Sequence, residues 1–492
     1  MSPQATRSAP PEPIPLPARA SLSSRWTLGA ILLLAASLRL LGLRSYVFSQ
    51  DELYTVIEST KLFHSPLRPG IGARPLYYLL EHVLLGVWPP TPLAMRVAPF
   101  VFGVLGVWLT WLVGKIVIGE VGGLLAAFLL AISPWHLFAS GMARYWSLVY
   151  LMTALGYLAL HRAEQRGRTR DCVLAVAVWV LASATHPTTL FPLVGAALAL
   201  RLVRPDGSIG WRWPSPQVWK ALWVPLALCL LGGYAALALS GNGSAVRNFS
   251  GRGSLATLRL LPAMVQWMTP TVFVLGAAGA LALALLGSNA ERRCWGLMAV
   301  LGCGSAMTLL VIASTITDVY AEYGMAMLPL LFVSGGALVQ LVYEGLSAAL
   351  RRLFAGAATV VLAAGIVPGT VSHLSDGTRF DYRLAFQFIR THAPDVAVVT
   401  WPLVVQQYYA SDLRASELTP DTVALHSLLQ RQHDLWAVVS VQRYGIVTDD
   451  GGNLAAWLLR RCRLAFSHQR PRLDYRLYRV DLYRCAADSL LR

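Results

Sequence analysis

Two adjacent carboxylates, Asp51 and Glu52, follow the first long apolar segment of this 492-residue chain. Carboxylates beside a bilayer are costly unless something uses them, so an acidic pair in this position indicates a functional site. Acids are also stabilising in the first turn of a helix, and this structural role is the alternative explanation. Chemistry at a lipid surface is therefore the first hypothesis for the pair.

The composition is that of a protein with many membrane spans. Hydrophobic residues make up 55% of the chain and charged residues only 13%, with a mean hydropathy of +0.53, whereas about a quarter of the residues in a soluble domain are charged. A net charge of +16 would suggest nucleic-acid binding in a soluble chain. Here the arginines fall largely between apolar segments, as the positive-inside rule expects, so we attribute the charge to membrane topology and expect no nucleic acid.

About eleven apolar segments can be interpreted as transmembrane helices, which need about 20 residues each. They are 26–48, 97–118, 122–138, 146–161, 173–184, 188–202, 221–239, 262–286, 295–316, 324–342 and 353–371. A further segment, 75–88, has 14 residues, and as a helix it would reach only about 21 Å against a hydrocarbon core of about 30 Å. It also carries Glu81 and His82, so we expect it to lie on the membrane surface.

The charge pattern supports this topology. With the N-terminus in the cytosol, the loops 161–171, 201–220, 291–293 and 344–352, which carry Arg residues, all fall on the cytosolic side. The outer face then receives the loops 49–96, 139–145 and 240–261, the turn 317–323 and the tail from 372. Loop 240–261 is the exception because it holds three arginines, which could meet an anionic lipid head group. Within 49–96 we expect two surface helices, one with Asp51 at its N-terminus and one that starts at Pro75.

Several short motifs occur in an order that resembles a known group of enzymes. They are Asp51-Glu52 after the first span, the Arg-Pro-Leu-Tyr-Tyr-Leu-Leu run 74–80, Arg96 at the start of the next span, the Ala-Ile-Ser-Pro run 131–134 followed by Ala-Arg-Tyr at 143–145, and Tyr323 six residues before Pro329. This ordered set, within residues 28–336, is similar to that of the GT-C membrane glycosyltransferases, specifically the bacterial relatives of the protein O-mannosyltransferases and the lipid A aminoarabinose transferase.

The resemblance implies a polytopic α-helical transferase of the bacterial cytoplasmic (inner) membrane. Such an enzyme moves a sugar from a polyprenyl-phosphate-linked donor to a lipid, glycan or protein acceptor at the extracytoplasmic face. Asp51 matches the catalytic carboxylate of the family, and Glu52 could orient the acceptor or the base. An acceptor hydroxyl that attacks an anomeric carbon needs a base within hydrogen-bond reach, and partial desolvation raises the basicity of a carboxylate.

The leaving lipid phosphate needs cations, and the planar donor fork of arginine suits this role. The candidate donor phosphate-binding residues are Arg144, Arg74, Arg96 and Tyr323. The alternative for the arginines, above all for Arg74 and Arg96, is extension to the lipid head groups, and for Tyr323 it is a place in the interfacial aromatic belt. For a further arginine, Arg39, we favour extension to the lipid head groups. Candidate substrate-binding residues are Tyr77, Tyr145 and His186, although we expect His186 to cap the turn 185–187 and not to catalyse.

The sequence departs from the metal-dependent part of the superfamily. Relatives that bind a divalent metal carry a second acid in the second outer loop, and residues 140–146 contain none. We therefore expect no metal and no other cofactor, with arginines supplying the electrostatic stabilisation. Use of a divalent metal is the alternative.

From about residue 374 the pattern changes to short strands and helices, which predicts a small α/β domain outside the membrane. We thus expect a disordered cytosolic tail at 1–25, a transmembrane transferase domain at 26–372 and a periplasmic or extracellular domain at 373–492. Strands at 464–467 and 475–483 would set Cys462 opposite Cys485. Since a tail outside the membrane faces an oxidising compartment, we predict a disulfide between them.

The competing function is that of a multi-span transporter or a lipid flippase without transferase chemistry. Such proteins tend to show internal repeats and helices broken at the midplane, and no repeat is visible in this sequence. An interaction subunit that has lost catalysis is a further alternative, and the retained acidic pair argues against it.

Overall fold

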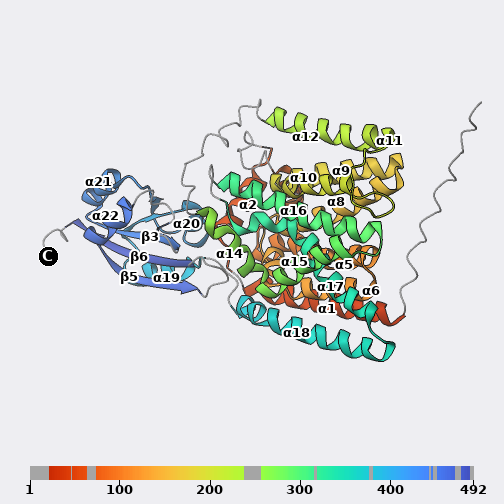
Figure 1. The fold of residues 1–492 in the computed structure, drawn as a ribbon. Coiled ribbons are helices and arrows are strands. Elements are labelled where there is room, and N and C mark those ends of the chain that lie inside the picture. The colour runs from red at the N-terminus through yellow and green to blue at the C-terminus, as the bar shows by residue number, and fades with distance from the viewer. Residues whose placement is uncertain are drawn as a thin grey trace, which may run out of the picture.

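The computed structural model describes residues 22–45, 47–63, 74–237, 256–314, 319–375, 380–442, 445–446, 452–470 and 478–487. These residues form a bundle of apolar helices that ends with α18 and a small α/β domain at one end of the bundle (Figure 1). Most of the expected cytosolic tail 1–25 and of loop 240–261 lies outside the described residues.

Helices occupy the segments in which spans were expected. They are α1 (Leu22–Ser45), α5 (Pro92–Val117), α6 (Glu120–Ala131), α7 (Pro134–Ser140), α8 (Trp146–Arg166), α9 (Thr169–Thr185), η1 (Pro187–Thr189), α10 (Leu190–Leu202), α11 (Pro216–Val218), η2 (Trp219–Trp223), α12 (Val224–Leu237), α14 (Ala256–Met268), α15 (Pro270–Leu286), α16 (Ala290–Ser314), η4 (Ala321–Met327), α17 (Leu328–Gly345) and α18 (Ala348–Ser375).

The expected number of about eleven spans is not confirmed. Within the described residues, five helices are long and apolar enough to cross a membrane, and seven if each of two bent pairs counts as one span. The five are Ser23–Leu43, Pro92–Val117, Ala290–Ser314, Ala321–Gly345 and Ala348–Ser375. Others are too short by themselves: α10, with 13 residues, reaches only about 20 Å.

Prolines account for the two bends. The α6–α7 pair bends by 64° and the α14–α15 pair by 99°, and in each case the second helix begins at a proline, Pro134 or Pro270. Proline has no N–H to donate to the preceding turn, but it fits the first position of a helix, where that donor has no partner anyway. The apolar run therefore continues through the bend while the helix does not.

Small residues allow the remaining helices to approach closely. A side chain at Gly279 of α15 would overlap the Ser334 carbonyl of α17, and one at Gly195 of α10 would overlap the Leu301 carbonyl of α16. Close backbone contact of this kind is how apolar helices associate where the surroundings are equally apolar.

The two short helices expected in the first outer loop are present. α2 (Gln50–Thr60) and α4 (Pro75–Leu85) have 11 residues each, so neither reaches across a bilayer. α2 buries the side chains of Glu52, Thr55 and Ser59, and α4 buries Tyr77, Tyr78 and Glu81. Each helix therefore buries one carboxyl side chain, Glu52 in α2 and Glu81 in α4.

The C-terminal domain is a mixed sheet with helices, as predicted. Strands β1 (Ala397–Thr400), β2 (Ala415–Glu417), β3 (Asp434–Gln442), β4 (Gly445–Ile446), β5 (Cys462–Arg470) and β6 (Tyr478–Ala486) run in the order β2-β1-β3-β6-β5, with β4 beside β3. β1 is parallel to β2 and β3, and the other pairs are antiparallel. The helices are α19 (Arg383–His392), α20 (Leu403–Tyr409), α21 (Thr422–Gln432) and α22 (Asn453–Arg461).

The predicted disulfide is confirmed. Cys462 lies directly opposite Cys485 in the β5–β6 ladder, and the two are bonded with their Cα atoms 4.0 Å apart. Part of the expected second strand, 475–477, and the turn before it lie outside the described residues.

Candidate functional site

The acidic pair lies in the first turn of α2, as the sequence predicted. Ser49 is the residue before the helix: its hydroxyl accepts from the Glu52 N–H at 3.4 Å, and its own N–H donates to Glu52 Oε2 at 2.9 Å. This reciprocal capping fixes the start of the helix. Asp51 is partly exposed, and the helix N-terminus favours its negative charge.

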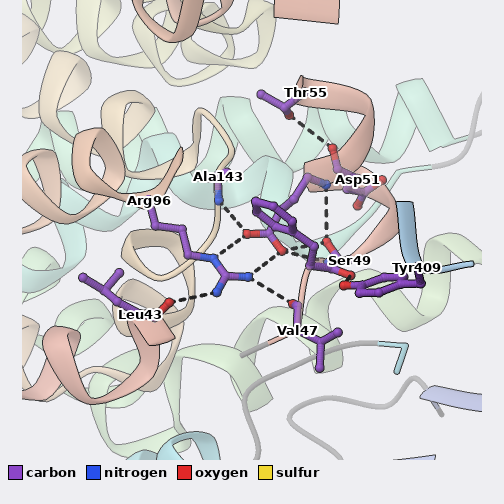
Figure 2. Close-up of polar contacts among 10 residues, drawn as sticks. Leu43, Val47, Ser49, Asp51, Thr55, Arg96, Ala143 and Tyr409 are labelled. Carbon is purple, nitrogen blue, oxygen red and sulfur yellow. Dashed lines mark hydrogen bonds and ion pairs between the residues drawn. The ribbon is translucent and has the colours of Figure 1, made fainter. Parts of the chain in front are cut away.

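Glu52 is fully committed to a buried ion pair with Arg96 of α5. Arg96 Nε donates to Glu52 Oε1 at 2.7 Å and Arg96 Nη2 to Oε2 at 2.9 Å, and both residues are 1% exposed. The Ala143 N–H also donates to Glu52 Oε1, at 2.9 Å. Figure 2 shows this network. A buried ion pair is tolerated when further hydrogen bonds satisfy both partners, which is the case here.

Arg96 also connects the end of the first span to this site. Its Nη1 donates to the Leu43 carbonyl at 3.2 Å and its Nη2 to the Val47 carbonyl at 3.0 Å (Figure 2). The guanidinium is thus engaged by the protein itself, and the geometry gives no support to its predicted role in binding the donor phosphate.

Arg74 and Arg144 converge on one tyrosine hydroxyl. Arg74 Nη1 donates to Tyr145 Oη at 2.6 Å and Arg144 Nη2 to the same oxygen at 3.3 Å. Each guanidinium carbon lies 4.9 Å from the Tyr145 ring centroid. Within the described residues, neither arginine has a carboxylate within ion-pair distance. Two neighbouring guanidinium groups that have no direct ion pair can form a site for an anion, and for phosphate in particular.

Arg144 also links this anion site to the acidic pair. Its Nη1 donates to the Asp51 carbonyl at 3.2 Å, and Thr55 Oγ1 donates to the same carbonyl at 3.1 Å. Asp51 and the two arginines are therefore brought together from α2, from the residue before α4 and from the loop between α7 and α8.

The other predicted site residues gather around Tyr145. The His186 ring stacks on the Tyr145 ring with centroids 5.0 Å apart, and Tyr323 lies 5.3 Å from His186. Trp146 contacts both His186 and Tyr323, and the Tyr77 ring is 6.1 Å from that of Tyr145. The structure thus brings together Tyr77, Tyr145, His186 and Tyr323, which come from four separate segments.

His186 caps η1, as the sequence predicted. Its Nδ1 accepts from the Thr188 N–H at 3.2 Å. Burial lowers the pKa of His186, so the ring is neutral. With Nδ1 as an acceptor, the ring proton belongs on Nε2, which is buried and has no partner among the described residues. His186 can therefore donate one hydrogen bond to a bound group.

One feature of the site was missed by the sequence reasoning. Glu81 of α4 is fully buried beside Tyr77, which lies four residues earlier on the same face. Within the described part of the chain, neither carboxylate oxygen has a partner in good hydrogen-bond geometry. Burial raises the pKa of Glu81 to about 7. The signal in the sequence is the spacing, since residues four apart on a helix lie on one face.

The expectation for Arg39 was wrong. The side chain is only 2% exposed: its Nη2 lies 2.6 Å from His136 Nδ1, and its Nη1 donates to the Ala131 carbonyl at 3.3 Å. The guanidinium is held between α1 and the α6–α7 break, so it does not extend to lipid head groups.

Metal binding stays a matter of prediction. Among the described residues, no three His, Cys, Asp or Glu side chains lie together in a way that could hold a metal ion.

Comparison with known proteins supports the resemblance seen in the motifs. The family described as dolichyl-phosphate-mannose-protein mannosyltransferase matches residues 75–231. A search of curated proteins by sequence gave no match. Among solved structures, ArnT from Cupriavidus metallidurans in the apo state is similar, with a TM-score of 0.53 and 12% identity over 95% of this chain and 99% of ArnT.

Two further structures share the fold. The oligosaccharyltransferase AglB from Archaeoglobus fulgidus has a TM-score of 0.53 at 13% identity, covering 85% of this chain and 69% of AglB. The arabinofuranosyltransferase AftD from Mycobacteria has a TM-score of 0.51 at 16% identity, covering 95% of this chain and 42% of AftD. The predicted resemblance to the GT-C superfamily, and within it to the protein mannosyltransferases and ArnT, is confirmed at the level of the fold.

Proposed function

We propose that this chain is a membrane glycosyltransferase that uses a polyprenyl-phosphate-linked sugar donor. The acceptor is a lipid, glycan or protein at the extracytoplasmic face of the bacterial inner membrane. The observation that carries the proposal is that Arg144 contacts the Asp51 backbone and shares the Tyr145 hydroxyl with Arg74, while neither arginine forms an ion pair within the described residues. Sugar transfer from a lipid phosphate needs a base for the acceptor and cations for the leaving group.

The ligands of the similar structures agree with this donor class. ArnT was also solved bound to undecaprenyl phosphate, and that structure matches this chain with a TM-score of 0.52. The AglB structure contains a dolichol-phosphate and an inhibitory peptide. Both lipids are polyprenyl chains that end in phosphate, which is the group we assign to the arginine pair.

In the proposed reaction, the Asp51 carboxylate accepts the proton of the acceptor hydroxyl. The acceptor oxygen forms a bond to the anomeric carbon, and the bond between that carbon and the phosphate oxygen breaks with its electron pair on the phosphate. Arg74 and Arg144 stabilise the charge that develops on this phosphate, and the His186 Nε2–H and the Tyr323 hydroxyl supply further donors. Tyr77 and Tyr145 line the side of the site next to α4.

Glu52 and Arg96 have a different role in this proposal. Because their charges satisfy each other and the surrounding backbone, they hold the start of α2 against α5 and do not contact substrate. We further propose that the reaction needs no metal, since the arginines carry the positive charge that an ion would supply.

The proposal is tested with purified protein in nanodiscs, labelled polyprenyl-phosphate sugars and a membrane extract as the source of acceptors. Wild-type protein should release polyprenyl phosphate, which is measured by thin-layer separation. Asp51→Asn should lower the rate of this release by about 10² or more. Asp395→Asn, an exposed acid in a turn of the C-terminal domain, is the matched control. A protein that binds or moves the labelled lipids without cleaving them would be a transporter or flippase, and the proposal would be rejected.

A further inference from the structure

The C-terminal domain contacts the turn that carries Asp51. Tyr409 of α20 donates a hydrogen bond from its hydroxyl to the Phe48 carbonyl at 2.9 Å. Phe48 directly precedes Ser49, the capping residue of α2. Figure 2 shows Tyr409 beside this turn, on the side away from Arg96.

A second tyrosine of the domain reaches the first residue of α2. The Tyr382 hydroxyl donates to Gln50 Oε1 at 3.0 Å and shares a 2.6 Å hydrogen bond with the Ser440 hydroxyl of β3. Tyr382 is fully buried, and burial raises its pKa, so the hydroxyl stays protonated and remains a donor. The charge of Asp51, the next residue after Gln50, acts on the same hydroxyl.

Apolar packing joins the two parts of the molecule at the same place. Phe48 and Leu53 are buried in one cluster with Phe386 and Val405 of the domain. The Phe48 ring lies 5.3 Å from the Arg96 guanidinium on one side and 5.5 Å from the Tyr408 ring on another. The junction is therefore a packed contact, with two tyrosine hydrogen bonds at its centre.

The position of α2 depends on such contacts. A helix of 11 residues is marginal in isolation, so packing must fix it. The Glu52–Arg96 pair holds its first turn from the membrane side, and the two tyrosines hold the same turn from the domain side. Asp51 projects from a segment that is fixed from both directions.

We propose that the C-terminal domain sets the position of Asp51 through Tyr382 and Tyr409, which are positioning residues for the transfer reaction. The inference rests on the proposed role of Asp51 as the base. A base that is displaced by about 1 Å can lose 10²-fold in rate even when its chemistry is unchanged. The domain then contributes to catalysis by fixing the position of Asp51, although in this proposal it supplies no group that touches the substrate.

The test compares Tyr382→Phe, Tyr409→Phe and the double variant with Tyr408→Phe as the matched control. The Tyr408 hydroxyl makes no hydrogen bond within the described residues, and phenylalanine keeps its ring contact with Phe48. We expect each of the first two variants to lower kcat about 3- to 10-fold and the double variant more. KM for the donor should stay within about 2-fold, because the phosphate-binding arginines are untouched. Tyr408→Phe should match the wild type.

A second comparison separates positioning from general loosening. Tyr382→Phe combined with Asp51→Asn should be no slower than Asp51→Asn alone, because the side chain that Tyr382 positions no longer acts. Gln50→Leu removes the other partner of the hydrogen bond, and its effect on kcat should not add to that of Tyr382→Phe. Additive losses in these pairs, or wild-type kcat in both tyrosine variants, would overturn the positioning role.

The same assays distinguish this failure from failure of the proposed function. If Asp51→Asn retains wild-type turnover, Asp51 is not the base, whatever the tyrosine variants do. If Asp51→Asn is inactive while Tyr382→Phe and Tyr409→Phe are fully active, the base assignment holds and only the positioning role is wrong.

Discussion

Replacing Glu52 by glutamine separates the roles of two neighbouring carboxylates. The Glu52 carboxylate accepts hydrogen bonds from Arg96 Nε and Nη2 and from the backbone N–H groups of Ala143 and Ser49. Glutamine has one acceptor oxygen and an NH₂ group, so in either orientation of the amide some of these donors face another donor. Arg96, which is 1% exposed, also loses its counter-charge.

The expected cost is large. Breaking a buried ion pair by removing one partner destabilises a protein by about 3–5 kcal/mol. Asp51 is partly exposed, and loss of its charge at the helix N-terminus should cost only about 0.3–1 kcal/mol. Glu52→Gln should therefore lower Tm clearly, whereas Asp51→Asn should keep Tm close to wild type and lower turnover by about 10² or more.

Both quantities can be measured on the same nanodisc preparations, by thermal unfolding and by release of polyprenyl phosphate. Glu58→Gln is the control for stability, because Glu58 lies on the same helix and makes no hydrogen bond within the described residues. A Glu52→Gln protein with wild-type Tm would refute the structural role of the ion pair. An equally large loss of Tm in Asp51→Asn would refute the division of roles between the two acids.

Three further predictions concern Glu81, the metal and the topology. Burial raises the pKa of Glu81 from 4.5 to about 7, so wild-type stability is full below the unfolded pKa and falls as pH rises from about 4.5 to 7. Glu81→Gln, which cannot ionise, should therefore gain about 2 kcal/mol relative to wild type between pH 5.5 and 8.5, and parallel Tm curves would contradict this. Turnover should persist in excess chelator, and a loss that added magnesium or manganese restores would show that a metal is used. A cysteine in place of Val83, which is 60% exposed on α4, should react with an impermeant thiol reagent outside intact cells, in a Cys229→Ser background. Labelling only after permeabilisation would show that α4 lies on the cytosolic side and that the predicted topology is wrong.

The sequence predicted best those features that depend on neighbours along the chain. The helix with Asp51 in its first turn, the short helix that starts at Pro75 and the pairing of Cys462 with Cys485 each follow from local periodicity, capping or strand register. The Ser49-x-x-Glu52 spacing is also that of a capping box, and this pattern could have indicated a structural role for Glu52 beforehand.

Contacts between distant segments could not be predicted in this way. Arg96 lies 44 positions from Glu52, and Tyr382 lies 332 positions from Gln50. Nothing in the local pattern shows that Arg96 will pair with the buried Glu52 carboxylate and not with a lipid phosphate. Hydropathy likewise located the apolar segments but not the bends at Pro134 and Pro270, because an apolar run looks the same whether its helix is straight or broken.

The contact of Tyr409 and Tyr382 with the α2 turn has a consequence for the order of biosynthesis. Residues 48–52 leave the ribosome early, but their partners follow 361 and 332 positions later in the chain. At about 5–20 residues per second, a delay of roughly 20 to 70 seconds separates insertion of the acidic pair from synthesis of the tyrosines that hold it. During this interval the first turn of α2 lacks the hydrogen bonds from Tyr382 and Tyr409. In the proposed mechanism, the chain therefore becomes competent for transfer only after the C-terminal domain has folded against the start of α2.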